Sequence, residues 1–155
     1  MSETWKDLDL KTLPGHYVRR IHQLAVALFV DELKDLNLTP VQYSSLQTIC
    51  NQPGIDQKTL CSTIGYDTST IGGVIDRLEA RGLVVRQVAS HDRRVRLLSP
   101  TKEGLQMLKD VVPPMLRSQE RFLEPLTPKE RKELMRLMKI LADANAEFSN
   151  IPTKE

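Results

Sequence analysis

The chain has 155 residues and a formal net charge of +2, which suits one domain, or one compact unit with an extension, that can bury a core. Apolar residues make up 40% and charged residues 27%, the proportions of an ordinary soluble globular protein. The longest apolar run, residues 24–30, is too short to span a bilayer, and residues 1–15 lack the basic-then-apolar pattern of a signal peptide. We therefore expect a cytoplasmic protein with no membrane partner.

The sequence contains no pattern that is typical of a catalytic, cofactor or metal site. Cys50 and Cys61 are too few for a disulfide framework and fall in apolar helical patterns, which favours small buried side chains. The three histidines, His16, His22 and His91, do not have the spacing of a ligand cluster. No Walker loop, nucleophile elbow or zinc-protease helix occurs. We expect a protein that is not an enzyme and holds neither a cofactor nor a metal.

In chain order, the first predicted element is a helix over residues 14–36. Its apolar stripe consists of Val18, Ile21, Ala25 and Leu28, widened by Leu24 and Phe29. A second helix begins after Thr39, which is a suitable N-cap, because Pro40 occupies the first helical position and Gln42 completes a capping box. The segment "NQPG" at residues 51–54 ends this helix.

Two shorter helices follow, joined by a tight turn. The first runs from about Asp56 and the turn contains Gly65. The second is capped by Asp67 and runs to Arg81, with Gly82 as its stop. Its apolar side is formed by Ile71, Val74, Ile75 and Leu78. Two helices at this spacing predict a helix-turn-helix, in which the second is the candidate recognition helix.

A basic β-hairpin is predicted directly after the recognition helix. The runs "LVVRQV" (83–88) and "VRLL" (95–98) are β-prone, and "ASHDRR" lies between them. Residues 76–102 contain seven Lys and Arg against three Asp and Glu, whereas residues 1–75 contain six against eight and residues 103–155 nine against nine. This local excess is the electrostatic signature of a phosphate-binding surface, although a solvated hairpin is the alternative. The hairpin is therefore a candidate wing.

Two long helices complete the chain. One begins at Thr101, and Pro113 with Pro114 should bend or break it. The other begins with Thr127 as its cap, and Glu130 closes a second capping box. Their apolar stripes contain Leu105, Leu108, Val112, Met115 and Leu116 in the former, and Leu134, Leu137, Met138, Leu141 and Ala144 in the latter. The final residues, 149–155, are expected to fray.

A small winged domain cannot cover the apolar faces of the first helix and the last two, so we expect a homodimer that shares them. A two-fold dimer also suits DNA with two half-sites. The predicted fold is mainly α with a small β-hairpin wing. A winged helix-turn-helix lobe spans residues 37–100, and residues 1–36 and 101–155 form a helical dimerisation region.

This element order resembles the MarR family of winged helix-turn-helix transcriptional regulators over roughly residues 14–148. The most specific stretch is "IDRLEARGLVVRQVASHDRRVRLLSPTKEG", residues 75–104. Asp92 and Arg94 match the family's Asp-x-Arg wing tip and Thr101 its helix start, whereas Pro100 replaces the usual Leu. The resemblance implies a dimer that binds pseudo-palindromic double-stranded DNA, with the recognition helix in the major groove and the wing in the minor groove. Many members repress transcription until a small molecule, often an aromatic acid, binds between the dimerisation helices and the DNA-binding lobe.

The predicted DNA contacts are Thr68, Ser69, Thr70, Gly73, Arg77, Arg93, Arg94 and Arg96. The first three are small donors at a helix start, where the dipole and free amides favour phosphate. Gly72 and Gly73 indicate close approach, either to DNA or to a neighbouring helix. Arg77 shares a face with Gly73 and should contact phosphate, whereas Arg81 fits a solvated charge at the helix end.

In the wing, Arg94 is the candidate for the minor groove, because a narrow minor groove attracts arginine. Asp92 would be repelled by DNA, so we expect it to orient Arg94 or another arginine through a charged hydrogen bond. Arg93 and Arg96 are candidates for phosphate contact. For Arg96 a solvent-facing strand position is the alternative.

An effector site is predicted on the first helix. His16 and Arg20 are four residues apart and share a face, and the family resemblance brings Tyr17 and Tyr43 near them. Arginine can hold a carboxylate with two hydrogen bonds, and His and Tyr can bond a ring substituent, so the expected effector is an aromatic carboxylate. The alternative is that His16 and Arg20 make ordinary dimer contacts.

Two other functions stay open beside a ligand-responsive repressor. The family resemblance implies that an oxidant sensor would carry its reactive cysteine early in the first helix, and no cysteine precedes Cys50, which disfavours a thiol-redox sensor of the same fold. A helical dimer without DNA binding is disfavoured by the basic wing.

Overall fold

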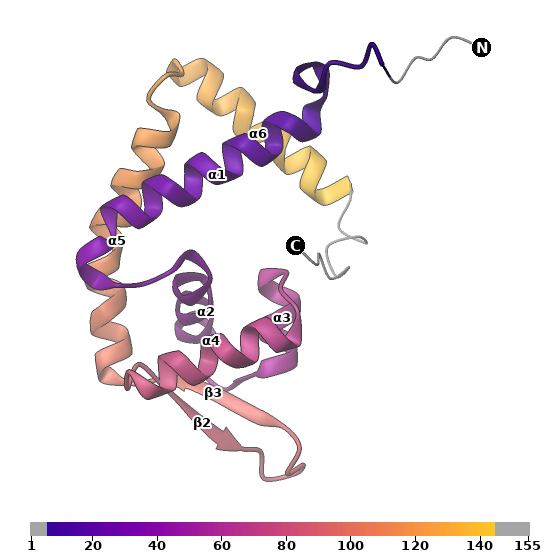
Figure 1. Ribbon diagram of the computed structural model, residues 1–155. Coiled ribbons are helices and arrows are strands. Elements are labelled where there is room, and N and C mark those ends of the chain that lie inside the picture. The colour runs from indigo at the N-terminus through magenta and orange to yellow at the C-terminus, as the bar shows by residue number, and fades with distance from the viewer. Residues whose placement is uncertain (1–5, 145–155) are drawn as a thin grey trace.

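The computed structural model describes residues 6–144. Eight of its elements are helical and three are strands within this range. In chain order they are η1 (Leu10–Thr12), α1 (Pro14–Glu32), η2 (Lys34–Leu36), α2 (Pro40–Asn51), β1 (Ile55–Asp56), α3 (Gln57–Ile64), α4 (Thr68–Ala80), β2 (Val84–Val88), β3 (Arg96–Pro100), α5 (Lys102–Leu123) and α6 (Pro128–Ala144). The predicted fold class is confirmed, because a winged lobe lies at one end and α1, α5 and α6 extend away from it (Figure 1). The expected frayed end at 149–155 lies outside the described residues.

The winged lobe is built on a three-stranded antiparallel sheet with the strand order β1-β3-β2. The hairpin strands pair with Arg86 opposite Leu98, and Ile55 of β1 pairs with Leu98 from the other side. β1 was not expected from the sequence. It fastens the chain between α2 and α3 to the wing, so that the helix-turn-helix and the hairpin form one body.

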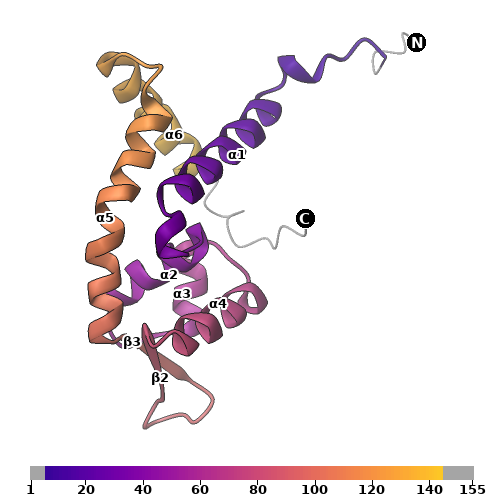
Figure 2. The ribbon, with the colours of Figure 1, turned by 60° about the vertical axis from the view of Figure 1, so that its left-hand side comes forward.

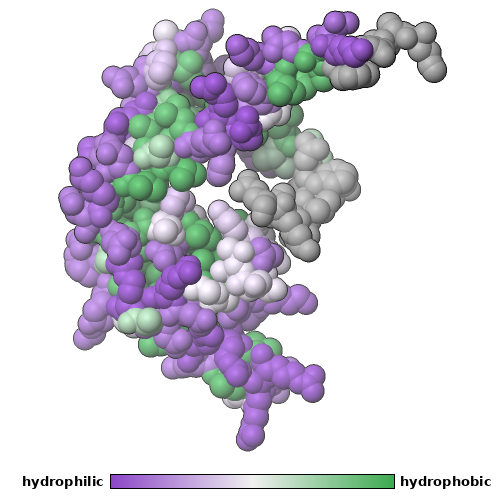
Figure 3. All heavy atoms as spheres, viewed as in Figure 1, coloured by the Kyte–Doolittle hydropathy of each residue, from purple (hydrophilic) through white to green (hydrophobic). Residues whose placement is uncertain are grey.

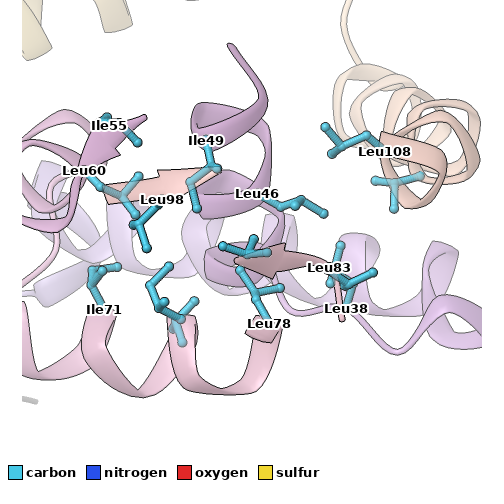
Figure 4. Close-up of a cluster of buried hydrophobic side chains, with 14 of the residues drawn as sticks. Leu38, Leu46, Ile49, Ile55, Leu60, Ile71, Leu78, Leu83, Leu98 and Leu108 are labelled. Atoms are coloured by element: carbon cyan, nitrogen blue, oxygen red, sulfur yellow. The ribbon is translucent and has the colours of Figure 1, made fainter. Parts of the chain in front are cut away.

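The core of the lobe lies between α2, α3, α4 and the sheet (Figure 4). The predicted apolar side of α4 is buried as expected. Side chains with no exposed surface are Leu46, Ile49, Leu60, Ile71, Ile75, Leu78 and Leu98. Burial of this kind stabilises by about 1.5–3 kcal/mol for each large aliphatic side chain, which holds α4 firmly on the lobe.

Local capping fixes where most helices start. Thr39 and Gln42 form the predicted capping box, with bonds of 3.1 and 3.3 Å, and Thr127 with Glu130 forms the second. The predicted end of the first helix at residue 36 is wrong, because α1 ends at Glu32 and a separate 3-10 turn follows. Asn37 then adopts a left-handed conformation with φ of 48°, which stops the helical path before α2.

We expected Pro113 and Pro114 to bend or break this helix. α5 is one helix through both prolines, so the break does not occur (Figure 2). Each proline removes one backbone donor, and Pro114 is buried in the fold. α5 is also held against α1 by ion pairs: Arg117 bonds Glu32 at 2.9 Å, and Arg121 bonds Asp31 and Glu32 at 2.6 and 2.9 Å. These contacts hold the part of α5 that follows the prolines against the end of α1.

Two helices leave apolar side chains uncovered in the protomer. Val18, Ile21 and Leu24 of α1 are exposed, and the described helix α6 buries no residue. The exposed apolar residues of α6 are Met135, Leu137, Met138, Ile140 and Leu141. Figure 3 shows hydrophobic side chains gathering at the surface around α1 and the upper part of α5. None of the helices within residues 6–144 is long and apolar enough to cross a membrane.

Candidate nucleic-acid interface

The helix α4 and the β2–β3 hairpin lie together at the end of the molecule farthest from α1 and α6 (Figures 1 and 2). Apolar burial of one side of α4 leaves its other side to solvent. Ser69, Gly73 and Arg77 are spaced four residues apart and therefore form one stripe on that outer side. Ser69 and Arg77 are exposed, and the Arg77 guanidinium has no recorded partner within residues 6–144.

The start of α4 differs from the prediction of three free donors. Asp67 accepts hydrogen bonds from the Thr70 backbone N–H at 2.8 Å and the Thr70 hydroxyl at 2.7 Å. The same bonds hold the pKa of the Asp67 carboxyl below its usual value. The helix terminus thus already carries an anion, which disfavours phosphate there. All three residues are exposed, but the Thr70 hydroxyl is bonded to the cap, so Thr68 and Ser69 are the better candidates for DNA contact.

Close packing does not explain the glycines of α4. A Cβ atom at Gly73 would meet nothing within 4 Å, and one at Gly72 would meet only Gln57 Nε2, at 3.6 Å. Of the two explanations for Gly73, packing against a neighbouring helix of the protomer is therefore wrong. Close approach of Gly73 to DNA stays a prediction.

The wing tip is a hydrogen-bonded turn that presents two arginines. Asp92 accepts the Arg94 backbone N–H at 2.9 Å, and the Asp92 carbonyl accepts the Val95 N–H at 3.1 Å. Asp92 thus orients the tip through the backbone and not through a guanidinium, which corrects the expected chemistry. Arg96 donates to the Arg93 carbonyl at 2.6 Å, so part of its guanidinium shapes the turn. The guanidinium groups of Arg93 and Arg94 are exposed and have no recorded partner in the described range.

Arg86 connects the wing to α4 and was missed in the sequence. It lies on β2 and forms ion pairs with Asp76 and, at 3.3 Å, with Glu79, both on α4. Its side chain is only 22% exposed. The spacing of Asp76 and Glu79, three residues apart, is a signal of a shared partner, but only the fold identifies that partner.

The far end of α4 is anchored to the segment before α2 and to the start of α5. Arg81 donates to the carbonyl oxygens of Asn37 at 2.7 Å and Leu36 at 3.1 Å, so it is not the solvated charge that we expected. Thr101, at the start of α5, donates its hydroxyl to the Gly82 carbonyl at 2.6 Å. Gly104 packs so closely that a Cβ there would lie 2.1 Å from the Leu83 carbonyl oxygen. These contacts tie the end of α4 to the segment just after η2 and to the start of α5.

The predicted effector residues do not converge in one protomer. His16 and Tyr17 are neighbours, with ring centroids 5.5 Å apart, but Tyr43 packs against Phe29, 5.8 Å away. Phe29 lies nine residues after Arg20, about two and a half turns, and so points to the opposite side of α1. Tyr43 is therefore separated from Arg20 by the helix itself. The helical period of α1 places Arg20 and Phe29 on opposite faces, but it does not indicate which face α2 covers.

The described residues give little support for a redox-active cysteine or a metal site. Burial raises the pKa of the Cys50 thiol, and it does the same for Cys61. No group of three or more His, Cys, Asp or Glu in residues 6–144 is placed to hold a metal ion.

Known proteins share this arrangement. A family model described as MarR family matches residues 36–95. The putative transcriptional regulatory protein for the hcr operon of Thauera aromatica is 36% identical over 134 residues, which cover 86% of this chain and 81% of that protein. The PcaV transcriptional regulator of Streptomyces coelicolor, solved with its natural ligand, is 34% identical with a TM-score of 0.78, over 88% of this chain and 96% of that chain.

A second solved structure, BpsR of Bordetella bronchiseptica, is 28% identical with a TM-score of 0.83, over 88% of this chain and 97% of that chain. The DNA binding of BpsR is regulated by 6-hydroxynicotinic acid. These relatives are named as regulators and not as enzymes, in agreement with the expectation from the sequence. With its winged lobe and a relative more than 30% identical over most of its length, the chain belongs to the MarR family of transcriptional regulators.

Proposed function

We propose that this chain acts in the cytoplasm as a homodimeric repressor that binds a pseudo-palindromic operator and is released by a small aromatic carboxylate. The observation that carries DNA binding is the common orientation of two surfaces. The stripe of Ser69, Gly73 and Arg77 on α4 suits a major groove, and the free guanidinium groups of Arg93 and Arg94 suit the adjacent minor groove and phosphates.

The uncovered apolar faces support the homodimer. α6 has at least five exposed large apolar side chains and buries none, and α1 has an exposed apolar stripe. A large contiguous apolar patch exposed to water indicates an interaction surface. A second copy offers the same faces and would place two copies of α4 for two half-sites. The dimerisation region then consists of α1, α5 and α6, and the DNA-binding lobe of the elements between them.

An aromatic acid as effector is supported by the response of BpsR to 6-hydroxynicotinic acid, a heteroaromatic carboxylate. Arg20 is exposed and His16 half-buried on one face of α1, so they can hold a carboxylate and a ring substituent. Tyr17 completes this group. Because Tyr43 lies on the other side of α1, we propose that a second copy, and not Tyr43 of the same protomer, completes the site.

The thiol-redox alternative is weaker on chemical grounds. A redox-sensing cysteine is accessible and has a lowered pKa, because the thiolate is the reactive form. Cys61 is buried and Cys50 is half-buried, and burial raises the pKa of both thiols.

The test is selection of genomic DNA fragments by the purified chain, followed by titration of a recovered fragment with a panel of aromatic acids. We expect a recovered sequence with dyad symmetry, and one or more acids that weaken binding about 5–150-fold, the usual range of allosteric coupling. Arg20→Ala should abolish that response and leave the DNA affinity nearly intact, whereas Tyr43→Phe should keep the response. Recovery of random fragments would contradict specific DNA binding, and an equal response of the Arg20 variant would contradict the effector site.

A further inference from the structure

The ion pairs of Arg86 join the two parts of the molecule that we assign to different grooves. Arg86 lies in the middle of β2, directly opposite Leu98 of β3. Its guanidinium reaches Asp76 and Glu79 on α4. We propose that Arg86 is a positioning residue, which fixes the wing relative to the recognition helix so that both fit one DNA duplex. This inference rests on the proposed DNA binding of α4 and the wing.

Stability alone gives a poor account of this contact. Asp76 and Glu79 remain 68% and 45% exposed, so water competes for both carboxylates and the ion pairs contribute little to folding. The Nε atom of Arg86 is buried without a hydrogen-bond partner among the described residues, which is unfavourable. An apolar residue at this position would avoid that cost. A role in geometry accounts for a guanidinium at this position.

The ion pairs of Arg86 also affect the charge that α4 presents to DNA. Asp76 lies one residue before Arg77 and three after Gly73, and so belongs to the outer side of α4 that would approach DNA. A free carboxylate there would repel phosphate. Arg86 holds Asp76 and Glu79 toward the wing and compensates part of their charge. Between the recognition stripe and the wing, the two carboxylates and the guanidinium together carry a net charge of −1, where the carboxylates alone would carry −2.

A double-mutant cycle separates positioning from the alternatives. The variants are Arg86→Gln, the pair Asp76→Asn with Glu79→Gln, and all three together. The readout is the ratio of affinities for the operator fragment recovered by genomic selection and for a scrambled duplex of equal length. Thermal unfolding is measured in parallel, and binding is measured well below the unfolding midpoint. Arg136→Gln, which removes an exposed pair with Glu133 on α6, is the matched control.

If Arg86 acts through Asp76 and Glu79, two variants should lower the ratio of operator affinity to scrambled-DNA affinity. These are Arg86→Gln, by roughly tenfold, and the double variant Asp76→Asn with Glu79→Gln. The triple variant should then lose no more than Arg86→Gln alone, and Arg136→Gln should lose nothing. Asp76 and Glu79 are exposed, so the variant that replaces both is expected to fold even if Arg86→Gln does not. The inference can therefore be tested with that variant alone.

Three results would overturn the inference. If Arg86→Gln lowered the affinity for operator and scrambled DNA equally, and this loss added to that of the carboxylate substitutions, Arg86 would contact phosphate directly. A lower unfolding temperature with an unchanged operator preference would mean a structural role only. A wild-type chain without preference for any duplex would instead refute the proposed DNA binding itself, and this inference with it.

Discussion

Replacing Gly73 by alanine should raise the stability of the protein and weaken its binding to DNA. The new Cβ would meet no atom within 4 Å in the protein, so nothing opposes the higher helix propensity of alanine. The expected gain is about 1 kcal/mol, or about 2–4 °C in the unfolding midpoint for a chain of this size. On DNA the same methyl group intrudes between α4 and the groove. A steric cost of about 1–3 kcal/mol corresponds to roughly 5–150-fold weaker operator binding.

Thermal unfolding and fluorescence anisotropy with a labelled operator measure the two effects separately. Gly72→Ala is the matched control, because its Cβ makes an ordinary 3.6 Å contact with Gln57 and points about 100° away from Gly73 around the helix. It should stabilise α4 similarly and weaken DNA binding less. A fall in the unfolding midpoint of Gly73→Ala would refute the open space seen around this glycine. Unchanged operator affinity would refute the close approach of α4 to DNA.

Other substitutions test other parts of the account. Gly104→Ala should destabilise the fold by about 1–3 kcal/mol in chemical unfolding, because its Cβ would lie 2.1 Å from the Leu83 carbonyl oxygen; equal or higher stability would contradict that packing. Arg94→Ala should leave the fold intact and weaken operator binding by about 1–3 kcal/mol, and unchanged affinity would make the wing assignment wrong. Light scattering without DNA should give about twice the 17.6 kDa chain mass, and removal of residues 126–155 should produce aggregates and not a well-behaved monomer. Acid unfolding should depend on Glu32, whose pKa is lowered by hydrogen bonds from Arg117 and Arg121. Its stabilising contribution is present above the ordinary glutamate pKa of 4.5 and is lost as the pH falls through the lowered value, so Glu32→Gln should flatten that part of the stability curve.

Features that depend on nearby residues could be predicted from the sequence. The caps at Thr39, Asp67 and Thr127 join a side chain to the backbone three residues later, so the sequence contains both partners at a fixed spacing. The buried side of α4 followed from its helical period for the same reason. The hairpin followed from two β-prone runs, and its strands pair over five residues each.

Features that depend on distant residues could not be predicted in this way. β1 is only two residues long and exists because it pairs with β3, more than forty residues later. Arg81 finds its partners 44 and 45 residues earlier, so by sequence it resembled an ordinary solvated charge. The helical period places Arg20 and Phe29 on opposite faces of α1, but it does not show which face packs against Tyr43 of α2. Only the tertiary arrangement separates them.

A hydroxyl-radical footprint of the chain on an operator fragment, recovered by genomic selection, tests the central claim most directly. If two protomers each place one recognition helix in the major groove, protection should appear in two half-sites related by a dyad. Their centres should be about 10–10.5 base pairs apart, or a multiple of that spacing, because one helical turn separates equivalent grooves. Protection should extend into the flanking minor groove where the wings bind, and Arg94→Ala should remove that extension. A single protected patch without symmetry, or protection that is equal along any duplex, would contradict a dimeric, sequence-specific regulator.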